Sequence, residues 1–298
     1  MIYECTIIGF GKVGKTLSLL MNREKTRCLL RRIAHHTPPP SGLSYEAISR
    51  FCADEILDGK TTEELNIDEL RTIRGIVALT VPDKVIGRVA EKLAVQCEVV
   101  TGTVVFHCSG VYTSDLLEPL RAKGAFTASI HPAFSFGAPL SSANSFANTV
   151  CSYEGDDEAL NILLPIFENF GGNLVPIDSQ LKATYHAGCC VASNYLVGLY
   201  ALSENILVSA GIPQNTIPSI LIPLMQSTIN NLSQCPPAEA LSGPIARNDT
   251  STVELHIRNL SEKYAYYYKN LGNLLIDQSG LPHREEIKKI LAKIPTSE

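Results

Sequence analysis

Short apolar runs rich in β-branched residues alternate with helical patterns from residue 2 to residue 177. In the helical stretches, apolar side chains recur every three to four positions. Such alternation is typical of βαβ units and a mainly parallel sheet. The expected strands are Cys5–Gly9, Leu29–His35, Gly75–Val81, Val104–His107, Phe126–Ile130, Thr149–Ser152 and Asn173–Ile177. The expected helices are Gly14–Met21, Ile86–Ala94, Ser114–Lys123 and Asp157–Phe170.

One stretch of this first half gives no clear pattern. It runs from Thr37 to Leu70, and its three consecutive prolines, Pro38–Pro40, favour an extended loop.

The pattern changes after Asp178, where only helical periodicity remains. The expected helices are Lys182–Ser209, Thr216–Leu232, Thr250–Leu275 and Arg284–Lys293. No charged side chain occurs from Asn205 to Ala238, but prolines and amides interrupt this stretch before it reaches the roughly 20 apolar residues of a membrane span. We therefore expect helices buried in a core or at a subunit interface. The predicted fold is α/β, with a Rossmann-type, doubly wound domain at 1–178 and an all-helical domain at 179–298.

Composition supports a globular protein and excludes some partners. A chain of 298 residues favours about two domains, and with 45% hydrophobic and 18% charged residues it can bury substantial cores. The net charge of −5 gives no overall attraction for nucleic acid or anionic lipid, so neither is an expected partner. The start, MIYECTIIGF, lacks the basic region of a secretory signal. The nine cysteines include no C-x-x-C pair, so we expect a cytoplasmic protein without a metal site.

A glycine motif follows the first predicted strand and leads directly into the first predicted helix. It comprises Gly9, Phe10, Gly11, Lys12, Val13 and Gly14, a complete G-x-G-x-x-G. In this context Gly9 permits the tight turn, Gly11 lets a pyrophosphate approach the backbone, and Gly14 lets helix and strand pack closely. The free N–H groups at the helix start favour the phosphates. The motif predicts a dinucleotide site; the alternative is a glycine-rich turn without a ligand.

The end of the second predicted strand suggests which dinucleotide is bound. An Asp or Glu is expected there when the ribose 2′-hydroxyl of NAD is held. This chain instead has Arg31, Arg32, His35 and His36, with no carboxylate nearby. Arg32, His35 and His36 therefore favour the 2′-phosphate of NADP(H), although NAD(H) remains possible. The alternative is that these are solvated surface charges.

Three further strand ends carry polar residues, and ligands of open α/β sheets bind outside such ends. Val81 and Pro82 are candidates for the nicotinamide pocket, and Asp83 is expected to cap the next helix. His107 ends a later strand and Ser109 comes just after it, and His131 follows the next strand. These positions are candidates for substrate or cofactor contacts, although a single histidine is more often structural.

The helix at the domain junction offers a second group of candidates. Lys182 and His186 lie four residues apart and share a helix face, and both can move protons. Asn194 lies about 18 Å further along the helix, so it would touch a different part of a ligand. The alternative for the Lys182–His186 pair is an exposed first turn.

A later loop, SGPIARNDTST, separates two apolar helices. Arg247 could clamp a carboxylate or phosphate, or form an ion pair with Asp249 in a capped surface loop. Asp249 or Thr250 is expected to cap the following helix.

Taken in order, six segments resemble one protein family: GFGKVG, TVPDKVI, FHCSG, SIHPAFSF, YHAGCCVASNYL and SGPIARNDTSTVELHI. The chain is similar to proteins classed as NADP oxidoreductases of unestablished substrate, which join a Rossmann-like N-terminal domain to a C-terminal domain of unknown function 2520. The likeness spans almost the whole chain except Thr37–Leu70. More distantly, the layout is similar to pyrroline-5-carboxylate reductase, ketopantoate reductase and the 6-phosphogluconate dehydrogenase superfamily.

The resemblance implies a nicotinamide cofactor, a helical substrate and dimerisation domain, and a homodimer formed through that domain. Lys182 falls where several of these relatives place a lysine that acts in proton transfer. His186 stands where they have an asparagine, so their chemistry does not carry over directly. The SGPIARND loop lacks the residues of the substrate loop of pyrroline-5-carboxylate reductase, which argues against that substrate.

The main hypothesis is an NADP-dependent oxidoreductase that transfers hydride to or from a small carbonyl or imine. His186 would act as general acid or base, Lys182 would polarise the carbonyl or imine, and Ser109 would orient the substrate or the nicotinamide. The expected substrate contacts are His107, His131, Asn194 and Arg247. One alternative is a non-catalytic NADP(H)-binding sensor. Another is a deazaflavin-dependent NADP reductase, with hydride passing between two cofactors.

Overall fold

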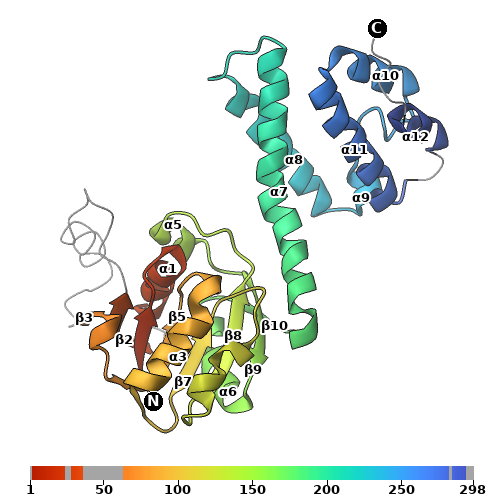
Figure 1. The fold of residues 1–298 in the computed structure, drawn as a ribbon. Coiled ribbons are helices and arrows are strands. Elements are labelled where there is room, and N and C mark those ends of the chain that lie inside the picture. The colour runs from red at the N-terminus through yellow and green to blue at the C-terminus, as the bar shows by residue number, and fades with distance from the viewer. Residues whose placement is uncertain (1, 24–27, 36–62, 282–283, 293–298) are drawn as a thin grey trace. The chain divides into compact units, whose positions relative to one another are not determined.

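The computed structural model describes residues 2–23, 28–35, 63–281 and 284–292 (Figure 1). Its contacts divide the chain into two compact units, Met1–Val191 and Ala192–Glu298, and each is described by itself. The strands end at Pro176, and the long helix α7 (Lys182–Ser209) begins shortly afterwards. The first turns of α7 belong to the first unit, so Lys182 and His186 are described together with the sheet.

The first unit contains an eight-stranded sheet in the order β10-β9-β8-β7-β5-β1-β2-β3. Six of the strands are mutually parallel, β9 is antiparallel to β8, and β10 runs parallel to β9. The mainly parallel, doubly wound sheet is therefore confirmed, including all seven strands expected from the sequence. Their bounds are β1 Tyr3–Ile8, β2 Cys28–His35, β3 Glu63–Asn66, β5 Ile76–Leu79, β7 Val104–His107, β8 Phe126–Pro132, β9 Val150–Gly155 and β10 Asn173–Pro176.

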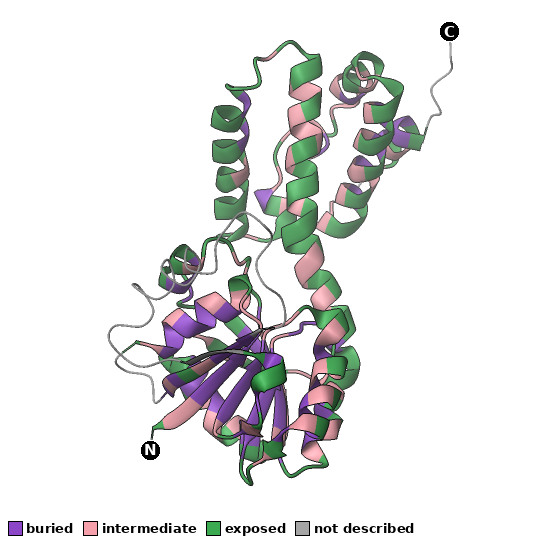
Figure 2. Ribbon diagram, turned by 60° about the vertical axis from the view of Figure 1, so that its left-hand side comes forward, coloured by how far each residue is buried: buried purple, intermediate pink, exposed green. Residues whose placement is uncertain are grey.

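Two apolar cores cover the two faces of this sheet, whose strands are largely buried (Figure 2). Alternate side chains of a strand enter opposite cores, as the pleat requires. Thus Ile7 packs in the first core and Ile8 in the second. The first core includes residues of α1 (Lys12–Met21), α5 (Pro139–Asn144) and α6 (Asp157–Asn169). The second includes residues of α3 (Ile86–Gln96), η3 (Ser114–Leu117) and α4 (Glu118–Arg121).

Several short elements were not expected from the sequence. They are β3, α5, the strand pair β4 (Thr72–Ile73) and β6 (Glu98–Val99), and the 3₁₀ turns η1 (Ile67–Glu69) and η4 (Ser179–Leu181). Each is too short to establish a hydrophobic period. The loop expected around Pro38–Pro40 lies outside the described residues. The prediction that Asp83 caps a helix is wrong: Pro82 occupies the N-cap position of η2 (Asp83–Val85), and the Asp83 carboxylate binds Ser109.

β9 and β10 run opposite to the other strands, and this reversal sets the direction of α7 relative to the sheet. β10 ends beside Tyr153, part-way along β9. The first turn of α7 then meets Ser129 of β8, and the next turn meets His131, two residues further along the same strand. α7 therefore runs in the direction of the parallel strands and passes their carboxyl ends, where ligands of such sheets bind.

The second unit is helical, as expected. It contains the rest of α7 together with α8 (Ile217–Leu232), α9 (Pro237–Ala240), α10 (Thr250–Asn259), α11 (Glu262–Ser279) and α12 (Glu285–Ala292). Asp249 caps α10 by accepting the Thr252 N–H at 3.0 Å, as predicted. None of the helices in the described part of the chain combines the length and apolar character that a membrane span requires.

The single helix expected at Thr250–Leu275 is wrong, because α10 and α11 are separate. Leu260 and Ser261 have extended backbones, with ψ values of 143° and 155°. Ser261 takes the N-cap position of α11, and Glu262 follows in its first turn, where negative charge is favourable. The apolar periodicity continues from α10 into α11, so it does not reveal the break. The N-cap at Ser261 marks where the second helix begins.

Candidate cofactor and active site

The glycine motif forms a tight strand-to-helix turn. Gly9 has φ +95°, and its N–H donates to Ala34 O at 2.8 Å. A Cβ on Gly14 would lie 2.3 Å from Gly9 O and 2.6 Å from Thr80 Oγ1, so only glycine fits where α1 crosses the loop. A Cβ on Gly11 would meet no atom within 4 Å, so this part of the loop faces open space. Gly9 and Gly14 therefore have the structural roles that the motif predicts, and the approach of a pyrophosphate at Gly11 remains a prediction.

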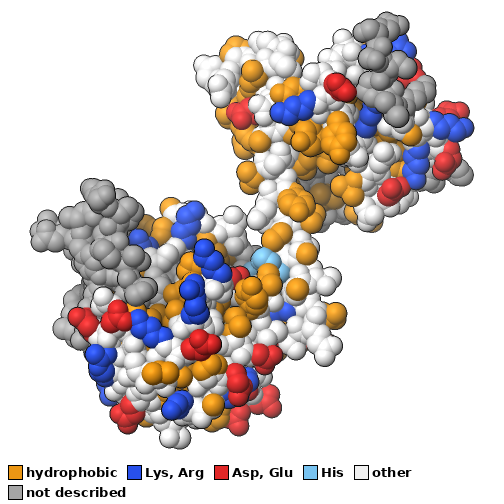
Figure 3. Space-filling model, viewed as in Figure 1, with side chains coloured by type: hydrophobic (Ala, Val, Ile, Leu, Met, Phe, Trp, Pro, Cys, Tyr) orange, Lys and Arg blue, Asp and Glu red, His pale blue; other side chains and the backbone are white. Residues whose placement is uncertain are grey.

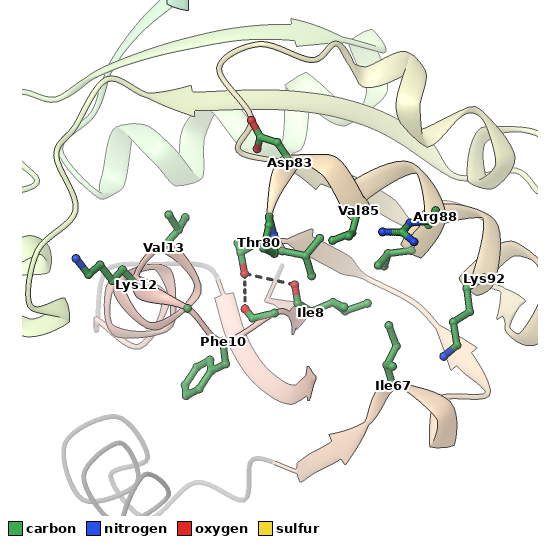
Figure 4. A pocket seen from close by; sticks show the side chains of 15 residues that line it. Ile8, Phe10, Lys12, Val13, Ile67, Thr80, Asp83, Val85, Arg88 and Lys92 are labelled. Atoms are coloured by element: carbon green, nitrogen blue, oxygen red, sulfur yellow. Dashed lines mark hydrogen bonds between the residues drawn. The ribbon is translucent and has the colours of Figure 1, made fainter. Parts of the chain in front are cut away.

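A cavity of about 830 Å³ adjoins this loop, the end of β5 and one side of α3 (Figure 4). Most of the residues proposed for the cofactor line it: Gly9, Phe10, Gly11, Lys12, Val13, Val81 and Pro82. Thr80 connects the two walls, because its hydroxyl donates to Gly9 O and its N–H donates to Ile8 O at 2.8 Å. Sequence reasoning missed Ile67, Val85, Arg88, Val89 and Lys92, which also line the cavity.

The basic end of β2 is placed differently from these residues. Arg32 does not line the cavity, and its Nη1 donates to Thr72 O at 2.8 Å. The side chain of His35 and the whole of His36 lie outside the described residues. Their proposed contact with a 2′-phosphate remains a prediction.

Lys182 is fully buried at the start of α7. Its Nζ donates to Ser129 Oγ and lies 3.1 Å from Glu154 Oε1 on β9. Glu154 in turn accepts the N–H and the hydroxyl of Ser114, at 2.9 and 2.8 Å. Burial lowers the pKa of Lys182, while the Glu154 carboxylate opposes that shift. The alternative of an exposed first turn is therefore wrong.

His107 adjoins the same cluster, since its Nδ1 lies 3.2 Å from Ser129 Oγ, and it is also fully buried. Its Nε2 is 3.0 Å from Thr113 O, so this nitrogen carries the proton. Its Nδ1 accepts the Ser109 N–H at 3.2 Å. Burial lowers the pKa of His107 to about 4. The ring is thus neutral at pH 7 with both nitrogens hydrogen-bonded inside the protein, which is a structural role.

Ser109 is nearly as buried, and its hydroxyl makes three internal contacts. It donates to Asp83 Oδ2 at 2.9 Å and accepts the N–H groups of Val111 and Tyr112 at 3.3 and 3.1 Å. The hydroxyl therefore fixes the turn after β7 and holds Asp83, a residue of the cavity wall.

His131 and His186 meet above this turn. Their ring centroids are 5.4 Å apart in an edge-to-face arrangement, and His131 Nδ1 lies 3.3 Å from the Tyr185 hydroxyl. A Cβ on Gly110 would come 2.2 Å from His186 Cδ2 and 2.8 Å from His131 Nε2. Glycine at position 110 thus lets both rings approach the end of β7. Burial, with repulsion from His186 and Lys182, lowers the pKa of His131 to about 4.

Two candidate substrate residues belong to the second unit. Asn194 is exposed on α7 and accepts the Ser193 hydroxyl at 2.9 Å. Arg247 is exposed in the loop before α10. Hydrogen bonds from Thr252 and Ser251 lower the pKa of Asp249, and the charge of Arg247 adds a smaller contribution in the same direction. The substrate roles of Asn194 and Arg247 remain predictions.

Comparison with known proteins agrees with this architecture. A protein-family model described as a Rossmann-like domain matches residues 3–132. A second family model, described as a domain of unknown function (DUF2520), matches residues 149–274. The chain joins a Rossmann-like domain to a DUF2520 domain. The family resemblance is therefore confirmed. No curated protein is detectably similar to it in sequence.

Solved structures share the fold over nearly the whole chain. Protein TM1727 from Thermotoga maritima is 26% identical, with a TM-score of 0.65 over 93% of this chain and 98% of that one. The "putative NADP oxidoreductase BF3122" from Bacteroides fragilis is 16% identical, with a TM-score of 0.71 over 93% and 99%. Pyrroline carboxylate reductase from Plasmodium falciparum, with NADP bound, is 10% identical, with a TM-score of 0.55 over 95% and 98%.

Gly14→Ala and Gly11→Ala should separate the two roles of the glycine motif. Gly14→Ala forces a methyl group against backbone, so we expect the free energy of unfolding to fall by about 1–3 kcal/mol. Gly11 has φ −77°, which alanine adopts, so Gly11→Ala should cost less than about 1 kcal/mol but weaken dinucleotide binding. Urea unfolding and calorimetric titration test both. Equal destabilisation by the two variants would contradict the assignment.

The Lys182–Glu154 pair should behave as a coupled unit. Lys182→Met leaves the Glu154 carboxylate buried without its cation, so the free energy of unfolding should fall by about 3–5 kcal/mol. Lys182→Met combined with Glu154→Gln should recover part of that loss, because no unpaired charge remains. Urea unfolding of both single variants and the double variant measures the coupling. Strictly additive losses would show that the two groups do not interact.

Proposed function

We propose that this protein is a cytoplasmic NAD(P)-dependent oxidoreductase, with NADP(H) preferred, that transfers hydride to or from a small carbonyl or imine. The observation that carries the proposal is the cavity over Gly11, which lies at the carboxyl edge of the sheet and is walled by the glycine motif and the end of β5. The NADP named with the pyrroline carboxylate reductase structure, which has the same fold, supports the choice of ligand.

The residues of the cavity suit a dinucleotide. The N–H groups at the start of α1 would hold the pyrophosphate, because Gly9 and Gly11 let it approach the backbone. Val81 and Pro82 would lie beside the nicotinamide. A bound reduced nicotinamide would supply the hydride.

His186 is the proton donor best supported by the geometry. His107 is buried with both nitrogens engaged, and His131 is neutral with a pKa of about 4. His186 is partly exposed and lies against Gly110 at the end of β7. During reduction it would give a proton to the carbonyl oxygen or imine nitrogen as the carbon receives hydride.

Lys182 is a positioning residue in the proposed mechanism, because it holds the helix turn that precedes His186. Its ammonium is fully buried and held by Ser129 and Glu154, and it fixes the turn of α7 that carries His186. Burial is the main cause that lowers the pKa of His131, and the positive charge of Lys182 adds to that shift.

Calorimetric titration with NADPH and NADH tests the cofactor. We expect NADPH to bind at least about tenfold more tightly than NADH, because recognition of its extra phosphate adds charge-assisted hydrogen bonds. Failure of both dinucleotides to bind would refute the proposed function. Binding without oxidation of NADPH across a panel of small aldehydes, ketones and cyclic imines would favour the sensor interpretation.

His186→Ala should lower kcat on an identified substrate by about 100-fold or more, with dinucleotide affinity nearly unchanged. His256→Ala is the matched control, because His256 is an exposed histidine of the second unit, hydrogen-bonded to Tyr268. Tyr185→Phe tests the neighbouring hydroxyl. Unchanged turnover in His186→Ala with a loss in Tyr185→Phe would transfer the proton-donor role to Tyr185.

The helical unit also supports the proposed homodimer. On α8, Ile217 and Leu221 are buried, whereas Ile222 and Leu224 are 56% and 61% exposed. Figure 3 shows hydrophobic side chains gathered over this part of the unit. Apolar surface of this kind favours association with a second copy.

Light scattering in solution should therefore give the mass of a dimer. Leu224→Glu should shift the protein to monomers, because it places a charge within the apolar surface. Val95→Glu, an equivalent change at an exposed residue of α3 in the first unit, should leave the dimer intact. A monomeric wild-type protein would rule out the dimer.

A further inference from the structure

The wall of the cavity formed by α3 carries two cations on one helix face. Arg88 and Lys92 lie one turn apart and both line the cavity (Figure 4). Lys92 forms an ion pair with Asp68, and Asp83, the acid of the cavity wall, accepts a hydrogen bond from Ser109. Arg88 makes no hydrogen bond or ion pair with any residue in the described part of the chain. It therefore has all its donors available to a ligand.

The position of Arg88 is unfavourable for the helix itself. It lies in the first turn of α3, which contains no acidic residue. A helix start carries partial positive charge, so cations are disfavoured there and acidic residues are preferred. A residue that opposes the local preference without a compensating contact indicates a role in binding.

Arg32, the cation that the sequence suggested, lies elsewhere. Its guanidinium binds Thr72 O and contributes positive charge near Cys97, the residue just past the end of α3. Arg88 is nine positions earlier, and that separation corresponds to about 13 Å along a helix. Arg32 and Arg88 therefore serve opposite ends of α3, and Arg88 is at the end that faces the cavity.

The neighbours of Arg88 suit a nucleoside. Ile67, Val85 and Val89 give this end of the cavity an apolar wall, which fits the flat face of a base. A guanidinium beside such a wall can hold a phosphate with two parallel hydrogen bonds. We propose that Arg88 recognises the 2′-phosphate of the adenosine half of NADP(H), with Lys92 adding positive charge. This inference rests on the proposed function and assigns cofactor preference to α3.

Calorimetry with adenosine 2′,5′-bisphosphate and with AMP tests the assignment without chemistry at the nicotinamide. Wild-type protein should prefer the bisphosphate. Arg88→Gln should weaken bisphosphate binding by about 10- to 100-fold and leave AMP binding nearly unchanged. Arg88→Lys should retain part of the preference for the bisphosphate, because the positive charge remains but the bidentate hydrogen bonding of the guanidinium is lost. Lys84→Gln is the matched control, because it removes the same charge from an exposed residue of η2 that does not line the cavity.

The outcomes separate this inference from the function on which it rests. If wild-type protein binds neither nucleotide nor NADPH, the proposed function fails and the role of Arg88 fails with it. If the wild type prefers the bisphosphate and Arg88→Gln keeps that preference, only the role of Arg88 is overturned. If Arg32→Gln loses the preference for the bisphosphate and Arg88→Gln keeps it, recognition of the 2′-phosphate belongs to Arg32 of β2.

Discussion

The buried ammonium of Lys182 is the constraint on which the candidate active site depends. Removing a charge from water is costly unless a counter-charge and hydrogen bonds meet it, so Lys182 requires both Ser129 and Glu154. That requirement fixes the first turn of α7 against two neighbouring strands. One turn later the helix places His186 beside His131 of β8 and against Gly110, where the absence of a side chain leaves room for its ring.

Three histidines lie close together, and the extent of their burial distinguishes their roles. His107 is buried, and its two ring nitrogens form hydrogen bonds that link β7 to the turn that follows it. His131 is partly enclosed and stays neutral, in part because Lys182 and His186 lie near it. His186 is partly exposed and is the proposed proton donor. The same ionisable group thus has different chemistry at each position, according to how much water and positive charge surrounds it.

The sequence predicted those features that depend on neighbours in the chain. The strand runs, the glycine motif and the shared face of Lys182 and His186 all follow from short-range spacing. Glu154 was missed because it is 28 residues from Lys182 and meets it only after β9 has reversed beside β8. Arg88 was missed for a similar reason, since its meaning depends on a cavity that the distant β1–α1 loop helps to form. Arg32 was a candidate because it is near a strand end in sequence, but its guanidinium binds Thr72 O and it does not line the cavity.

The continuity of α7 has a practical consequence for dissecting the protein. Secondary structure alone suggests a cut near residue 178, where strands give way to helices. A fragment ending there would retain Glu154 and Ser129 but lose the cation that they hold, and the carboxylate would have to hydrate or take up a proton. A recombinant form of the first unit should therefore keep the opening turns of α7 through Val191.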